Sequence, residues 1–303
     1  MPMPSTPAPT DQEESVRRVE RVASVIARAA GLARAGERSD FLTRRVAGLV
    51  DAQGVVAVDD LLRRAELGET AAIGELRNAL SVNYTYFWRE PEHFQILLEH
   101  AITSLRKKAG ASPRPALRFW SAACASGEEA WSMAIVAAEA RRLTGIDAAI
   151  DIVASDIDTA ALEEARRGQY SDEVMQQLPQ ELRQRYLQPL AQKASPCWQV
   201  SDALRSLVHF APLDLLATQW PLCENGDPFD VIFCRNVMIY LSDSARLHVF
   251  EKFSSLLAKD GLLFLSRVEG GINRAEPYFR PCGDSVYLLG AAARRTGVEG
   301  KRQ

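Results

Sequence analysis

The chain has 303 residues, 47% of them hydrophobic and 25% charged, which is the composition of an ordinary soluble globular protein. This length predicts one large or two modest domains with a sizeable buried core, and the net charge of −3 gives no indication of nucleic-acid binding. No apolar run reaches the roughly 18–20 residues that would span a bilayer, and the N-terminus lacks the basic and apolar regions of a signal peptide.

The five cysteines and four histidines are dispersed along the chain, and the cysteines form no CxxC pair. This distribution does not predict a zinc site, and an odd number of scattered cysteines is typical of reduced thiols in the cytoplasm. We therefore expect a cytoplasmic protein with no bound metal, no nucleic-acid partner and no segment inserted in a membrane.

The first hundred residues have a helical pattern. Residues 1–14 are rich in Pro, Ser and Thr and are expected to be a disordered tail, whereas 15–108 show apolar residues at helical spacing without strand alternation. Pro91 occupies a typical first helical position, so a helix is expected from there to about Lys108. A linker containing Gly and Pro, 109–116, ends this predicted helical domain.

Positive charge is concentrated near the start of the helical domain. Between residues 15 and 50 the chain carries eight arginines and three acidic residues. The arginines on the first predicted helix are Arg17, Arg18, Arg21 and Arg28. Two interpretations remain open: a solvated helix face, or a docking face for an acidic partner.

From residue 117 the pattern changes to strands that alternate with helices, which predicts a parallel, doubly wound α/β sheet over 117–292. The expected strands are 117–123, 148–155, 206–211, 229–234, 262–266 and 285–289, and the expected helices are 128–142, 159–167 and 242–257. The alternation lapses over about 170–205, which we interpret as an insertion, and 293–303 is expected to be a second tail.

The most informative stretch reads RFWSAACASGEEAWSMA, residues 118–134. A buried strand, a turn of small residues and a helix N-terminus form the ligand-binding corner of an open α/β sheet, where a phosphate often docks on bare backbone N–H groups. Here Glu128 and Glu129 occupy that place, and their charge would repel a phosphate. Two carboxylates instead suit a ligand with hydroxyls and a positive group, such as S-adenosylmethionine.

Two acids follow the second strand. An acid at the end of this strand accepts hydrogen bonds from ribose hydroxyls in nucleotide-binding α/β folds, and Asp156 holds that position. Either Asp156 or Asp158 could instead cap the helix that begins near Thr159. We interpret Asp156 as the ribose ligand and Asp158 as the cap.

The loop NYTYFWR, residues 83–89, joins two predicted helices and combines aromatic rings with side-chain donors. Phe87 and Trp88 are expected to close the core. Asn83, Thr85 and Arg89 could converge on one ligand, in which case Arg89 would hold a carboxylate; the alternative is a surface arginine paired with a neighbouring glutamate.

Polar residues also follow two later strands. Asp214 and Leu215 come after the third strand, where an acid can read the adenine amine and an apolar neighbour can cover the ring; the alternative is a turn aspartate after a proline. Arg235 and Asn236 follow the strand 229–234, and Tyr240 comes soon after. Arg235 could instead pair with a core carboxylate, and Tyr240 could belong to the core.

These pieces, taken in order, resemble the CheR-type chemotaxis receptor methyltransferases. The matching motifs are ALSVNYTYFWREPEHF (79–94), FWSAACASGEEAWSMA (119–134), ASDIDTAALEEARRGQY (154–170), FAPLDLL (210–216) and FDVIFCRNVMIYL (229–241), with a weaker match at LLAKDGLLFLSRVEG (256–270). The resemblance covers roughly residues 15–290. Each motif is weak alone, but their ordered combination is highly specific.

The resemblance implies a small all-α N-terminal domain on a Rossmann-like methyltransferase domain with a short inserted β-subdomain. It implies transfer of a methyl group from S-adenosylmethionine to glutamates in the cytoplasmic helical bundle of a chemoreceptor. The family's cofactor contacts fall on Asn83, Thr85, Arg89, a glutamate of the GEE pair (Glu128 is favoured, Glu129 stays open), Asp156, Asp214, Leu215, Arg235 and Asn236. The residues implied at the catalytic site are Tyr240 and Arg89.

The chain departs from the family pattern at several places. Trp88 stands where the family commonly has Phe, and Asp214 where it often has Asn. The usual Gly-His-Ser-Glu after the late strand is Ser266-Arg267-Val268-Glu269 here. Asp214 keeps an acceptor for the adenine amine, and the change at 266–269 concerns the rim of the site.

The sequence gives different degrees of support to three other functions. An NAD-dependent oxidoreductase predicts a GxGxxG turn, but 123–127 contains one glycine. A nucleic-acid or small-molecule methyltransferase has no support from a basic run near the strand ends or from an NPPY-type tetrapeptide. A catalytically weak, cofactor-binding signalling scaffold stays open as the alternative.

Overall fold

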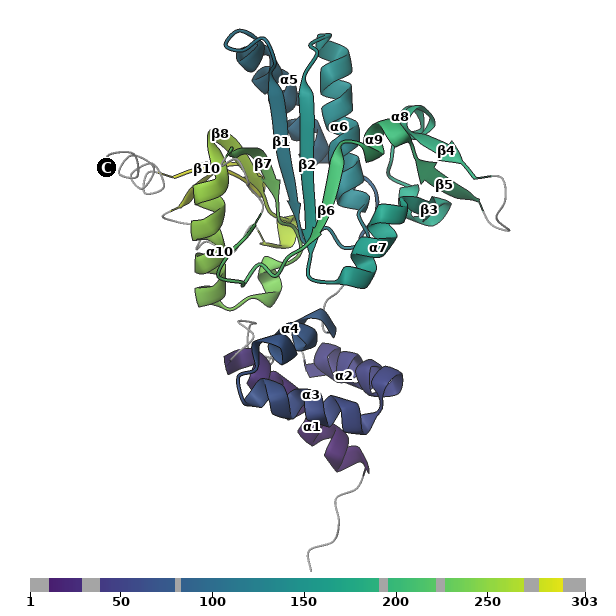
Figure 1. Ribbon diagram of the computed structural model, residues 1–303, viewed down its shortest axis with the longest axis vertical. Helices are drawn as coiled ribbons and strands as arrows, with labels where there is room; N and C mark the ends of the chain where they lie inside the picture. The colour runs from purple at the N-terminus through teal and green to yellow at the C-terminus, as the bar shows by residue number, and fades with distance from the viewer. Residues whose placement is uncertain are drawn as a thin grey trace, which may run out of the picture. The chain divides into compact units, whose positions relative to one another are not determined.

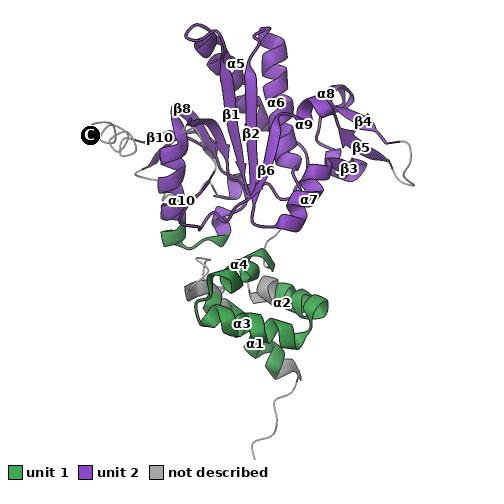
Figure 2. Cartoon of the chain, viewed as in Figure 1, with its two compact units in different colours: residues 1–81, 240–245 green, residues 82–239, 246–303 purple. Residues whose placement is uncertain are grey.

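The computed structural model describes residues 11–28, 39–79, 83–190, 196–221, 227–269 and 278–290. The chain divides into two compact units (Figures 1 and 2): an N-terminal unit, 1–81 with 240–245, and a sheet unit, 82–239 with 246–303. The predicted tails fall outside the described residues, except that the first helix already begins at Asp11. Within the described ranges, no helix has both the length and the hydropathy needed for a bilayer crossing.

The N-terminal unit consists of α1 (Asp11–Arg28), α2 (Ser39–Gln53), α3 (Val55–Glu66) and α4 (Thr70–Ala79), as the helical spacing predicted. Its core is formed by Val22, Val25, Val46, Leu49, Val58, Leu61, Leu62, Ala65, Ala72 and Leu76. Two arginines of the basic segment are paired inside this unit: Arg18 with Asp59 at 3.0 Å and Arg21 with Glu66 at 2.9 Å. The side chain of Arg28 lies outside the described residues.

The sheet unit contains the other elements. Its helices are α5 (Pro91–Ala109), α6 (Glu128–Thr144), α7 (Thr159–Arg167), α8 (Gln180–Tyr186), α9 (Asp202–Arg205) and α10 (Asp243–Leu256), the last beginning within 240–245, with 3₁₀ helices η2 (Asp172–Met175), η3 (Met238–Tyr240) and η4 (Arg267–Glu269). Its strands are β1 (Ala116–Ala122), β2 (Ala149–Asp156), β3 (Gln169–Ser171), β4 (Leu187–Pro189), β5 (Cys197–Val200), β6 (Val208–Pro212), β7 (Phe229–Phe233), β8 (Leu257–Phe264), β9 (Phe279–Gly283) and β10 (Val286–Leu289).

The main sheet has seven strands in the order β6-β2-β1-β7-β8-β10-β9 (Figure 1). The first five run parallel, whereas β10 is antiparallel to both β8 and β9. The expectation of a wholly parallel sheet is therefore corrected to a mixed one. The unpredicted strand β9 has a single buried residue, Phe279, and contains a proline, so its sequence carries no strand pattern.

The helix α6 is almost entirely buried, since every residue from 128 to 140 is buried. It packs against α5 and against β1 and β2, which explains its small, alanine-rich sequence. Because α5 packs on α6, the compact units divide between 81 and 82, earlier than the predicted domain end at 108.

The inserted segment forms a second, antiparallel sheet in the order β3-β5-β4, so the predicted β-subdomain is confirmed. Glu139 of α6 ties this subdomain to the main sheet unit, because it accepts hydrogen bonds from Arg185 Nη1 at 2.7 Å and Tyr186 OH at 2.6 Å, both on α8. Burial opposes its ionisation, but the hydrogen bonds from Arg142, Tyr186 and Arg185 lower the pKa of Glu139 to about 2.

Candidate active site

The register of the parallel strands brings the predicted site segments to one edge of the sheet. Ala122 at the end of β1 pairs with Ser155 of β2, Asp156 pairs with Pro212 at the end of β6, and Phe233 at the end of β7 pairs with Phe264 of β8. We call the segments that follow these five strands the carboxyl edge. From β1 the chain first adds β2 and β6 on one side of the sheet and then β7 and β8 on the other side. The order of the strands therefore reverses between β1 and β7, and open α/β sheets bind ligands at such a switch point.

Asp156 holds the turn that follows β1. Its carboxylate accepts hydrogen bonds from the N–H of Ala125 at 2.7 Å and from the N–H of Asp158 at 2.9 Å. The residue is 5% exposed, and burial raises its pKa. Asp158 caps α7 by accepting from the N–H groups of Ala160 and Ala161, so its predicted role as the cap is confirmed.

The turn itself approaches α7 closely. Ala123, Ala125 and Gly127 all have positive φ, which only glycine adopts without strain. At Gly127 a Cβ would also lie 2.7 Å from the Cβ of Ala165, so the position requires glycine. The hydroxyl of Tyr170 donates to the Ser126 carbonyl at 2.6 Å and fixes the same turn from the subdomain side.

The two glutamates of the GEE pair have different surroundings. Glu128 is 3% exposed and accepts from the Ser126 hydroxyl at 2.8 Å, and burial raises its pKa to about 7. Both oxygens of Glu129 are engaged inside the protein: one accepts from Ser121 Oγ and the other from Arg235 Nε, each at 2.7 Å. Glu128 therefore has acceptor capacity for a ligand, whereas Glu129 is occupied as a partner of Arg235.

Arg235 connects three segments of the site. Besides Glu129, it donates through Nη1 to the Arg89 carbonyl at 2.6 Å and lies 3.4 Å from His93 Nδ1. His93 Nε2 lies 3.3 Å from the Asp284 carbonyl, which can only accept, so Nδ1 is the acceptor for Arg235. Burial and the Arg235 cation lower the pKa of His93 to about 4, which keeps the ring neutral.

The Asn83–Arg89 loop is anchored at both ends, because Asn83 Nδ2 donates to Asp158 at 2.6 Å and the Arg89 carbonyl accepts from Arg235 Nη1 at 2.6 Å. Within the loop, Arg89 Nη1 donates to the Tyr84 carbonyl at 2.9 Å. Thr85 is half-buried between these anchors. Phe87 is fully buried, and Trp88 stacks on Phe94 with ring centroids 4.7 Å apart, so both aromatics close the core as predicted.

The segment after β6 borders Asp156, because the N–H of Leu213 donates to the Asp156 carbonyl at 2.8 Å. Leu215 is buried beside it. Asp214 Oδ1 accepts from the N–H of Leu216 at 2.8 Å, the geometry of an aspartate turn. This contact uses one oxygen of Asp214, so its predicted role at the adenine stays a prediction.

The segment after β7 is held by Glu269, which is not among the predicted site residues. Its carboxylate accepts from the N–H of Asn236 at 2.9 Å and from both the N–H and the hydroxyl of Ser266. Tyr240 ends η3 and belongs to the other compact unit (Figure 2), so its participation in the site stays a prediction.

The acceptor groups of the carboxyl edge fit S-adenosylmethionine. The two oxygens of Asp156 accept from the backbone N–H groups of Ala125 and Asp158 and retain acceptor capacity for ligand hydroxyls. The nearly buried Glu128 at the start of α6 suits a cationic or hydroxyl-bearing group and not a phosphate. Among the described residues, no three His, Cys, Asp or Glu side chains converge as a metal site.

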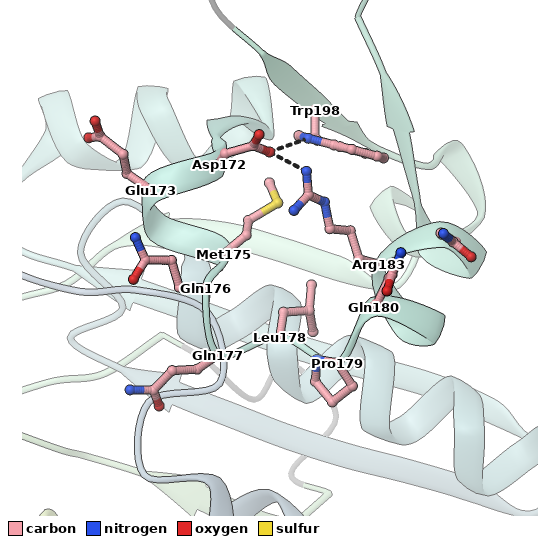
Figure 3. Close-up of a pocket in the computed structure, with 11 residues that line it drawn as sticks. Asp172, Glu173, Met175, Gln176, Gln177, Leu178, Pro179, Gln180, Arg183 and Trp198 are labelled. Carbon is pink, nitrogen blue, oxygen red and sulfur yellow. Dashed lines mark hydrogen bonds and ion pairs between the residues drawn. The ribbon is translucent and has the colours of Figure 1, made fainter.

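A pocket of about 740 Å³ lies in the subdomain, lined by residues of η2, α8 and β5 (Figure 3). Asp172 accepts from Trp198 Nε1 at 2.7 Å and pairs with Arg183, whose guanidinium lies 3.9 Å from the centroid of the Trp198 ring. None of the predicted cofactor residues lines this pocket, so it is distinct from the site at the carboxyl edge.

Comparison with known proteins gives one family. The family described as CheR methyltransferase, SAM binding domain, matches residues 83–286, a range that contains every predicted site residue. The chemotaxis protein methyltransferase of Escherichia coli (strain K12) is 34% identical over 272 residues, which cover 89% of each chain. Chemotaxis protein methyltransferase 2 of Pseudomonas aeruginosa is 39% identical over 214 residues, covering 69% of this chain and 71% of that protein. The chain therefore belongs to the CheR family of S-adenosylmethionine-dependent methyltransferases.

Proposed function

We propose that the protein transfers the methyl group of S-adenosylmethionine to glutamate side chains of a chemoreceptor and that the transfer occurs at the carboxyl edge of the main sheet. Family membership supports the reaction class, and the names of the relatives support chemotaxis as its setting. The single observation that carries the location is that two buried acids contact the turn after β1: Asp156 accepts from the N–H of Ala125, and Glu128 accepts from the Ser126 hydroxyl.

In the proposed site, Asp156 accepts hydrogen bonds from ribose hydroxyls, and Glu128 faces the cationic part of the cofactor. Asp214 and Leu215 border the adenine. Asn83 and Thr85 close the site from the loop, and Asn236 closes it from the end of β7. Arg235 acts mainly by holding the loop and α6 together, since its guanidinium is already engaged with Glu129 and the Arg89 carbonyl.

The acceptor in this reaction is a glutamate carboxylate, which is already an anion at neutral pH and requires no general base. S-adenosylmethionine supplies a methyl group on a sulfonium, which is a good leaving group. The protein therefore has to orient the two reactants and exclude water. The buried contacts of Asp156 and Arg235 provide the rigid frame for this orientation.

We assign Arg89 and Tyr240 to the incoming glutamate. The Tyr84 carbonyl uses one of the five donors of the Arg89 guanidinium, which leaves donors for a carboxylate. The rings of Tyr84 and Tyr86 lie 5.8 and 5.7 Å from this guanidinium and hold it by cation–π contact. The Tyr240 phenol would add one hydrogen bond without transferring a proton.

The proposed partner is the acidic, cytoplasmic helical bundle of a chemoreceptor. The basic segment of α1 was expected to contribute, but Arg18 and Arg21 already have partners on α3, which leaves the exposed Arg17 as the arginine with the clearest role. Exchange of Arg17 for Glu should therefore weaken receptor methylation at low salt and have less effect at high salt.

The test is transfer of radiolabelled methyl groups from S-adenosylmethionine into membranes that contain candidate receptors. The wild-type protein should produce label that alkali releases as methanol, as expected for a glutamyl methyl ester. Asp156→Asn should abolish labelling, whereas Asp260→Asn should preserve it, because Asp260 is an exposed aspartate that pairs with Lys107 of α5. Cofactor binding without any receptor labelling would refute the proposed methyltransferase activity and favour a signalling scaffold.

A further inference from the structure

Glu269 is a fully buried carboxylate placed between two segments of the carboxyl edge. One oxygen accepts from the N–H of Asn236 at 2.9 Å, from the N–H of Ser266 at 2.9 Å and from the Ser266 hydroxyl at 2.8 Å. The other oxygen lies 3.4 Å from the N–H of Ile239. The side chain thus joins the end of β8 to both ends of the turn that follows β7.

The Glu269 carboxylate is surrounded by neutral hydrogen-bond donors. Among the described residues, its partners are backbone N–H groups and one hydroxyl, with no lysine or arginine in an ion pair. A buried carboxylate without a cation is costly unless several donors surround it, so the geometry of these donors is tightly constrained. In return, the carboxylate determines the path of the backbone that supplies them.

The backbone at this turn needs such a constraint. Asn236 has φ of 63°, in the left-handed region, which asparagine adopts more readily than other non-glycine residues but which still costs free energy relative to an ordinary φ. The short helix η3 follows within two residues and ends at Tyr240. The contacts at Asn236 and Ile239 therefore hold the two positions between which the chain turns toward Tyr240.

We propose that Glu269, supported by Ser266, is a positioning residue that fixes Asn236 for cofactor binding and the start of η3 for the acceptor site. This inference rests on the proposed function of Asn236 and Tyr240. Ser266 stands at the position of the glycine in the Gly-His-Ser-Glu pattern, and a glycine has no side-chain hydroxyl. The departure from that pattern therefore adds one hydrogen-bond donor to Glu269.

The test compares three variants by the dissociation constant of S-adenosylhomocysteine, by kcat and KM for receptor methylation, and by thermal stability. Glu269→Gln replaces one acceptor oxygen by an amide NH2 group that faces a backbone donor, and should weaken binding on the order of tenfold. Ser266→Ala removes one of the donors and should weaken it about two- to threefold. Both should also lower kcat, because the acceptor side of the turn moves.

The matched control is Glu139→Gln, which also removes a buried carboxylate with several hydrogen-bond donors. Glu139 ties α6 to the subdomain and lies outside the proposed cofactor site. The control variant should lower thermal stability while leaving the dissociation constant unchanged. The inference is overturned if Glu269→Gln affects binding and kcat no more than Glu139→Gln does. If Glu269→Gln does not fold, Ser266→Ala decides, and wild-type binding of S-adenosylhomocysteine in that variant refutes the inference. A wild-type protein that binds this ligand but labels no receptor refutes the proposed function and still allows the binding comparison.

Discussion

Removal of one partner from the ion pair between Arg235 and Glu129 should destabilise the sheet unit more than removal of a partner from any surface pair. The distance between Arg235 Nε and Glu129 Oε2 is 2.7 Å, and the two side chains are 2% and 9% exposed. Arg235→Met would leave Glu129 buried with only the Ser121 hydroxyl and would also deprive the Arg89 carbonyl of its donor. Removal of one partner from such a pair typically costs about 3–5 kcal/mol, a large share of the roughly 5–15 kcal/mol that stabilises a protein.

A double-mutant cycle followed by urea denaturation measures both the single losses and the coupling between the two residues. Arg235→Met and Glu129→Gln should each destabilise the protein, and the double variant should be more stable than the sum of the two losses predicts, because no charge is left buried alone. The control is Arg63→Met: Arg63 pairs with Asp60 at the same 2.7 Å, but both side chains are at least half exposed, so the loss should stay within about 1 kcal/mol. A loss at Arg235 no larger than at Arg63, with additive effects in the cycle, would refute this reasoning.

Three further predictions follow from the site. Gly127→Ala should destabilise the protein by about 1–3 kcal/mol and weaken cofactor binding, since a Cβ meets Ala165; Gly145→Ala, also at positive φ but in open space, should cost less in a melting experiment and spare binding. Glu128 has a pKa raised to about 7, so its protonated form stabilises the fold below pH 4.5 and this contribution disappears as the pH rises to 7. Melting temperatures of Glu128→Gln should therefore decline less over this window than those of the wild type, and parallel curves would contradict the shift. Tyr240→Phe should lower kcat while sparing the affinity for S-adenosylhomocysteine, and an equal loss of both would exclude its assignment to the acceptor.

Most of the parallel strands could be predicted from the sequence because they contain an apolar run that is followed by polar or small residues. The helix α7 shows how local such information is: the cap Asp158 and the αL residue Gly168 mark its two ends directly. The antiparallel pairing of β9 could not be predicted, since that strand is exposed along most of its length. Its place depends on pairing with β10 and not on its own pattern.

The site was predictable only in part for a similar reason. The sequence placed Glu128 and Glu129 at a helix N-terminus but left their roles open, because adjacent residues project about 100° apart on a helix and only the neighbours decide which one faces inward. The partner of Glu129 is 106 residues away, and Glu269 meets Asn236 across 33 residues. The donors to Glu269 are mainly backbone groups, which leave no trace in the amino-acid sequence.

The most direct test of the central claim, that the carboxyl edge of the main sheet binds the cofactor, is hydrogen–deuterium exchange with and without S-adenosylhomocysteine. We expect protection in peptides that contain 83–89, 123–128, 156–158, 213–216 and 234–236, with unchanged exchange around the subdomain pocket at 172–184. Protection confined to the subdomain pocket, or bound ligand without protection at the turn after β1, would contradict the account.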